Sequence, residues 1–80
     1  MKRQIGERIK EIRIKKGLTQ SYVAKELGYK SPSMLSEIEA GKKGIDADKI
    51  PLLAKILDVD INELFFKEKI HEMRIFNHSA

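Results

Sequence analysis

The sequence contains no cysteine among its 80 residues, so neither a disulfide nor a thiolate-bound metal can support the fold. Its two histidines, His71 and His78, have no partner ligands nearby, and we interpret both as surface residues rather than metal ligands. The sequence therefore predicts no metal and no cofactor.

Long apolar runs are also lacking. After the first three residues the chain turns polar at once, which gives no apolar core of a secretory signal and no segment that could cross a bilayer. We therefore expect a cytoplasmic protein with no membrane partner. No β-type alternation or hairpin dipeptide occurs, which predicts a single all-α domain.

The usual signs of an enzyme are missing. The chain has no Ser or Cys paired with His, no glycine-rich phosphate loop, and little room for a substrate pocket of roughly 300–1,000 Å³. We expect neither catalysis nor a small-molecule substrate.

Positive charge is concentrated in the first part of the sequence. Residues 1–16 contain seven Lys and Arg against two Glu, a net charge of +5, whereas residues 17–45 carry +1 and residues 46–80 carry −2. A localised positive field suits a polyanion such as nucleic acid. A lysine-rich helix surface that faces only solvent explains the charge distribution equally well.

Helical spacing of apolar residues predicts five helices. The first runs from about residue 2 to residue 16, with Ile5, Ile9 and Ile12 on one face and Gly17 as its stop. The residues expected to face the core from the other helices are Val23, Ala24, Leu27, Met34, Leu35, Ile38, Ile50, Leu53, Ala54, Leu57, Leu64 and Phe65.

The second and third helices are short and joined by a tight turn. Thr19 is the expected N-cap of the second helix. The third spans residues 31–40, with Ser31 as its cap and Pro32 at its first helical position, where the missing N–H costs nothing. Two short helices joined by residues 28–30 form the arrangement of a helix-turn-helix.

The starts of the last two helices follow from capping residues. Pro51 loses no intrahelical hydrogen bond if Asp48 is the cap of the fourth helix, whereas a cap at Asp46 would break one. We therefore expect Asp48 to be the cap. Asp60 followed by Glu63 is a capping-box pattern that opens the fifth helix.

A set of dispersed residues agrees in order and spacing with a known family. They are Ile5-Gly6-Glu7-Arg8-Ile9-Lys10-Glu11-Ile12-Arg13, Gly17-Leu18-Thr19-Gln20, Val23-Ala24, Leu27-Gly28, Ser36, Ile38-Glu39, Gly41-Lys42 and Asn62-Glu63-Leu64-Phe65. This pattern resembles the XRE-type helix-turn-helix domains of phage repressors and Cro, bacterial regulators, antitoxins and restriction–modification controller proteins. We accordingly assign residues 1–66 to a five-helix repressor-like DNA-binding domain and residues 67–80 to a C-terminal extension.

The resemblance implies that the helix of residues 31–40 lies in the major groove while the second helix crosses the DNA backbone. The positions that would face base edges are Ser33, Ser36 and Glu37, with Lys30 and Ser31 approaching from the turn. Serine can pair with several bases, and a glutamate can accept a hydrogen bond from a cytosine amino group. The two helical serines could instead be ordinary solvated residues.

Three further residues are expected at DNA phosphates. In relatives, the residue at the position of Gln20 meets a phosphate at the start of the second helix. Lys42 and Lys43 follow the recognition helix and suit the flanking phosphate, although they could also belong to an ordinary loop.

Two charged residues are expected to be structural. Arg13 and Glu39 occupy positions that in relatives form a partly buried ion pair, which joins the first helix to the end of the third. Breaking such a pair when it is fully buried costs about 3–5 kcal/mol.

The chain departs from the family in one respect. Between Leu27-Gly28 and Ile38-Glu39 it has one residue more than the commonest family spacing, and we place the extra residue in the turn. A longer turn could shift the third helix in its groove.

The extension carries a second apolar stripe. Phe66, Ile70 and Met73 share a helical face that the five-helix core does not need, which predicts a symmetric homodimer with recognition helices about 34 Å apart. The alternative is a sixth helix that folds back on its own core.

The leading hypothesis is a sequence-specific regulator of transcription, a repressor of prokaryotic or phage type that binds double-stranded DNA as a homodimer. The competing hypothesis is an antitoxin or other interaction module whose main partner is a protein.

Overall fold

The computed structural model describes residues 2–65, and every regular element within that range is helical. Five α-helices are present: α1 (Lys2–Lys15), α2 (Gln20–Glu26), α3 (Pro32–Glu39), α4 (Ile50–Leu57) and α5 (Ile61–Phe65). A short 3₁₀ helix, η1 (Ala47–Lys49), leads into α4. The predicted all-α, five-helix fold is therefore confirmed. The predicted dimer stripe of Phe66, Ile70 and Met73, and both histidines, lie outside the described residues.

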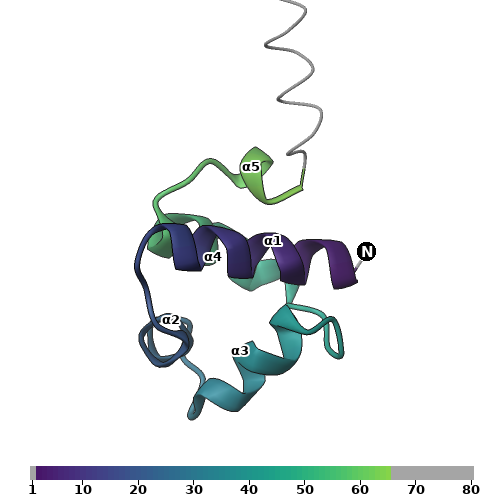
Figure 1. Cartoon of the computed structure of the whole chain (residues 1–80), viewed down its shortest axis with the longest axis vertical. Helices are drawn as coiled ribbons and strands as arrows, with labels where there is room; N and C mark the ends of the chain where they lie inside the picture. The colour runs from purple at the N-terminus through teal and green to yellow at the C-terminus, as the bar shows by residue number, and fades with distance from the viewer. Residues whose placement is uncertain (1, 66–80) are drawn as a thin grey trace, which may run out of the picture.

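Helix α1 lies between α5 and the α2–α3 pair. Figure 1 shows α5 on one side of α1 and the α2–α3 pair on the other. The helix ends as predicted, because Gly17 takes a left-handed conformation with φ of 74° and the Leu18 amide donates to the Arg13 carbonyl at 2.9 Å.

The N-caps of three helices are the ones that the sequence predicts. Thr19 Oγ1 accepts a hydrogen bond from the Tyr22 amide at 3.0 Å, and Ser31 Oγ accepts one from the Ser33 amide at 3.3 Å. Asp60 Oδ1 accepts from the amide of Asn62 at 3.0 Å. Each cap satisfies an amide of the first turn that has no partner within its helix.

The predicted start of α4 is wrong. Asp48 lies inside η1, and α4 begins at Ile50 with Lys49 at its N-cap position. The amide of Lys49 donates to the Asp46 carbonyl at 2.9 Å, so a 3₁₀ turn takes the place of a side-chain cap. Pro51 still falls within the first two helical positions, where its missing N–H removes no intrahelical bond.

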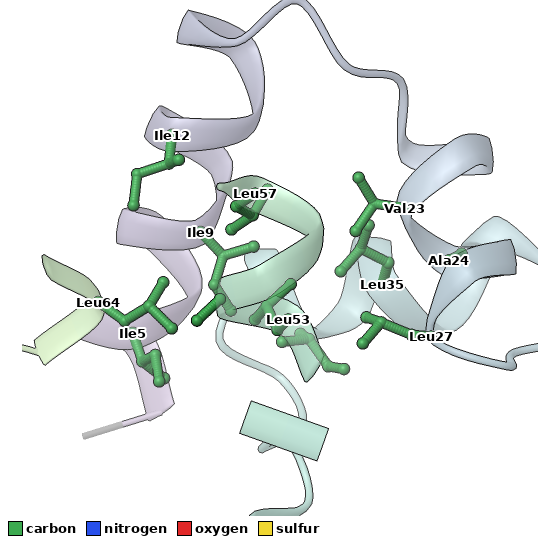
Figure 2. Packing of buried hydrophobic residues seen from close by; sticks show 12 residues of the cluster. Ile5, Ile9, Ile12, Val23, Ala24, Leu27, Leu35, Leu53, Leu57 and Leu64 are labelled. Carbon is green, nitrogen blue, oxygen red and sulfur yellow. The ribbon is translucent and has the colours of Figure 1, made fainter. Parts of the chain in front are cut away.

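One apolar core joins all five helices. Figure 2 shows Ile9, Leu53 and Leu57 close together in the space between α1 and α2, with Val23 and Leu35 approaching from the α2–α3 side. The buried apolar residues are Ile5, Ile9, Ile12, Val23, Ala24, Leu27, Leu35, Ile38, Leu53, Ala54, Leu57 and Leu64.

Three of the predicted core residues are not fully buried. Met34 and Ile50 pack against the core but keep part of their surface in solvent. Phe65 is 40% exposed, so its assignment to the core is wrong. Leu64 is the buried residue of α5, and the Phe65 side chain that follows it is largely accessible to solvent.

The contact between α1 and α3 depends on a glycine. A Cβ atom at Gly6 would collide with the carbonyl oxygen of Ile38 and lie 3.1 Å from that of Glu39. The two helix backbones therefore approach each other more closely than any side chain at this position would allow.

Candidate nucleic-acid interface

Helix α3 has a buried face and an exposed face. Leu35 and Ile38 are fully buried on the inner side, whereas Ser33 and Ser36 are exposed. This amphipathic arrangement leaves short polar side chains on an α-helix of eight residues, about 12 Å long.

Of the other three predicted base readers, Ser31 and Glu37 are partly engaged within the protein. Ser31 uses its oxygen as the acceptor that caps α3, but its hydroxyl can still donate. Glu37 Oε2 lies 3.6 Å from Lys43 Nζ, and both side chains remain accessible to solvent. Contacts within the protein therefore orient Ser31 and Glu37, and both side chains can still bind another molecule.

Lysines flank α3 at both ends. Lys30 lies exposed in the turn before the helix, and Lys42 and Lys43 lie exposed in the loop that follows it. The amides of Lys42 and Lys43 both donate to the Glu37 carbonyl, at 2.9 and 3.3 Å, which folds the loop back on the end of the helix. The structure thus places positive charge on both sides of the exposed serines.

A buried network joins α1, α2 and the end of α3. Arg13 Nε donates to Glu39 Oε2 at 2.7 Å, and Arg13 Nη2 donates to Glu39 Oε1 at 3.2 Å. Arg13 Nη1 also donates to the Leu18 carbonyl at 2.9 Å. The two charged residues are only 9% and 4% exposed. A bidentate pair with such burial fixes α1 against α3.

Gln20 belongs to the same network, which the sequence does not predict. Its Nε2 atom donates to Glu39 Oε1 at 2.9 Å. Gln20 is only partly buried, and an amide nitrogen carries two hydrogens, so the second remains for another acceptor. The Glu39 carboxylate therefore orients the amide at the start of α2.

Several cations of residues 1–16 serve the fold instead of the α3 surface. Arg8 Nε donates to the Glu63 carbonyl at 2.6 Å, and Lys16 Nζ donates to the Asp58 carbonyl at 3.3 Å. These acceptors lie in or next to α4 and α5, and Arg13 is buried in its ion pair. The high positive charge of residues 1–16 is thus partly structural.

A second contact that the sequence does not predict lies beneath the turn between α2 and α3. Lys49 Nζ donates to the Leu27 carbonyl at 3.0 Å and lies 5.2 Å from the centre of the Tyr29 ring. Burial raises the pKa of the Tyr29 hydroxyl, and the negative charges of Asp46 and Asp48 raise it further. No local sequence pattern signals this contact, because it joins residues 22 positions apart.

Within residues 2–65, no group of His, Asp or Glu is arranged to hold a metal ion. No helix in the same range is long and apolar enough to span a membrane.

Comparison with known proteins agrees with this geometry. A family model described as Helix-turn-helix matches residues 9–64. The chain belongs to the XRE-type helix-turn-helix family. Members of this family are DNA-binding regulators of transcription. In this chain α2 and α3, two short helices joined by a turn, are the helix-turn-helix unit.

One solved structure with the same fold is the restriction–modification controller protein C.AhdI from Aeromonas hydrophila. It shares 33% sequence identity with this helix-turn-helix chain at a TM-score of 0.73. The match covers 80% of this chain and 91% of C.AhdI. A search of curated proteins gives no match.

Proposed function

We propose that the chain is a sequence-specific regulator that inserts α3 into the major groove of double-stranded DNA and represses transcription by occupying its operator. The observation that carries this proposal is the exposed polar face of α3 between lysines at both of its ends. Its similarity to a restriction–modification controller protein supports a regulatory role.

Base edges would be met by the start of α3. Ser33 and Ser36 are exposed and can donate or accept, and Glu37 can accept from a cytosine amino group. Lys30 and the hydroxyl of Ser31 approach from the turn. Because this surface has few charged readers, we expect each base contact to contribute modestly to discrimination.

Phosphates would be met by residues around α3. Lys42 and Lys43 supply exposed charge after the helix, and Gln20 supplies an amide that Glu39 already orients. Such contacts position the protein without reading sequence. Affinity should then fall steeply as salt concentration rises.

We further propose that the chain binds as a homodimer, because one domain of this size covers a single half-site. Exposed apolar side chains support this proposal: Leu52 of α4 and Ile61 of α5 are 41% and 40% exposed, although the two helices contact each other. In the sequence, the predicted apolar stripe of Phe66, Ile70 and Met73 follows α5 and lies outside the described residues.

The proposal is tested by selecting bound duplexes from a random pool with the full chain. We expect a pair of inverted half-sites whose centres are about 10 base pairs apart, bound more weakly as salt rises. Recovery of unrelated sequences at every salt concentration would contradict sequence-specific binding. A single half-site would contradict the homodimer and leave the Leu52 surface to a different protein partner.

A further inference from the structure

The turn between α2 and α3 is the part of the helix-turn-helix unit that departs from the commonest family spacing. The end of α2 is held as far as Tyr29, whose amide donates to the Ala24 carbonyl at 2.9 Å. Gly28 takes a left-handed conformation with φ of 89°, and the cap of α3 begins only at Ser31. The position of α3 therefore depends on what fixes these few residues.

Lys49, the last residue of η1, holds this turn in place. Its ammonium bonds to the Leu27 carbonyl, one of the last carbonyls of α2, where the helix dipole favours a cation. The same ammonium lies over the Tyr29 ring at 5.2 Å, within the range of a cation–π contact. One side chain thus contacts the residues before and after Gly28, and a Cβ atom added at Gly28 would lie 4.0 Å from Lys49 Nζ.

The surroundings of Tyr29 show that the turn and η1 form one contact region. Tyr29 is half-buried against the core, and Asp46 and Asp48 lie near enough to influence its hydroxyl. The electron-rich face of the Tyr29 ring attracts the Lys49 ammonium. Lys49 is itself partly buried, unlike the lysines that flank α3.

We propose that Lys49 is a positioning residue for DNA recognition: by tying the lengthened turn to η1, it sets where α3 begins relative to the rest of the domain. This inference rests on the proposed function. Lys49 acts through Leu27 and Tyr29 and does not itself contact DNA. It compensates for the freedom that the additional turn residue introduces.

The decisive experiment compares Lys49→Met with Lys55→Met. Both variants lose one positive charge, but Lys55 is exposed on α4 and methionine at position 49 keeps most of the apolar stem. Each variant is titrated with the selected duplex and with a random-sequence duplex over a series of salt concentrations. Thermal unfolding establishes that both remain folded at the temperature of the assay.

We expect Lys49→Met to bind the selected duplex about tenfold more weakly than Lys55→Met does, while the two variants bind the random duplex equally and share one salt slope. Equal weakening on both duplexes, with a slope reduced by about 1, would make Lys49 a phosphate ligand and overturn the proposal. The proposal would also be overturned if the two variants bound the selected duplex with equal affinity. If Lys49→Met fails to fold, Lys49→Arg serves in its place and should retain selectivity, whereas lost selectivity would contradict the proposal.

A measurement without DNA separates this inference from the proposed function. Hydrogen exchange at the Tyr29 amide should be about tenfold faster in Lys49→Met than in Lys55→Met, because the turn loses a charge-assisted bond. Unchanged exchange would show that Lys49 does not hold the turn. Faster exchange in a protein that selects no duplex would instead overturn the proposed function, together with the role of Lys49 in recognition.

Discussion

The α3 side and the α4–α5 side of the domain use their side chains in opposite ways. Around α3, Lys30 and Lys42 flank the helix, Glu37 lies partly exposed on it, and Arg13 and Glu39 form a buried pair. On α4 and α5 the exposed side chains include Leu52 and Ile61, and residues 46–80 carry a net negative charge. The first surface carries the DNA contacts that we propose, and the second carries the dimer contact that we propose.

The largest expected effect comes from breaking the buried ion pair. Glu39→Gln keeps the shape of the side chain but leaves the Arg13 guanidinium buried without a negative partner. We expect the free energy of unfolding to fall by about 3–5 kcal/mol, measured by urea denaturation. The exposed Glu26→Gln is the control and should change it by no more than about 0.5 kcal/mol. If the two variants lose the same free energy of unfolding, the Arg13–Glu39 pair adds nothing to stability.

The next effect tests how closely α1 and α3 must approach. Gly6→Ala places a methyl group against the carbonyl oxygen of Ile38, so the helices must separate. Overpacking of this kind costs about 1–3 kcal/mol, to be measured as a lower urea midpoint. A midpoint equal to that of the unchanged protein would mean that the α1–α3 contact is looser than the structure indicates.

A substitution on the opposite side sharpens the comparison through association. Leu52→Lys places a charge on the exposed surface of α4 and should weaken the proposed homodimer by about 1–3 kcal/mol, measured by sedimentation equilibrium. Ile14→Lys is the matched control, because Ile14 is a 57% exposed aliphatic residue on α1. Equal association of the two variants would exclude the Leu52 surface from the dimer interface.

The smallest expected effect concerns a single phosphate contact. Lys43→Gln removes an exposed charge after α3 and should weaken binding to all duplexes alike, with the slope of log K against log salt reduced by about 1. Binding assays at several salt concentrations measure this slope. If only the selected duplex is affected, Lys43 reads bases instead of phosphate.

The sequence correctly predicts helix caps, which depend only on residues close together in the chain. Thr19, Ser31 and Asp60 cap helices because each accepts a hydrogen bond from an amide two or three residues ahead. The start of α4 escapes this reasoning, because a 3₁₀ turn replaces the aspartate cap. Phe65 escapes it too, because Leu64 is the buried residue of α5 and Phe65 beside it is 40% exposed.

A contact between residues far apart in the sequence could be predicted only where the family pattern indicates it. The Arg13–Glu39 pair is present at positions that the resemblance indicates. The bonds from Gln20 to Glu39 and from Lys49 to Leu27 have no such signal, since they depend on how the helices pack. The same packing directs Arg8 and Lys16 toward carbonyls beside α4 and α5, which composition alone could not indicate.

The surface that we propose to meet DNA is α3 and not the α4–α5 surface. Because the chain has no cysteine, Ser36→Cys and Leu52→Cys each introduce a unique attachment point for a photoreactive group. Irradiation in the presence of the selected duplex should link position 36 to DNA and leave position 52 unlinked. Linkage from position 52 without linkage from position 36 would contradict the account.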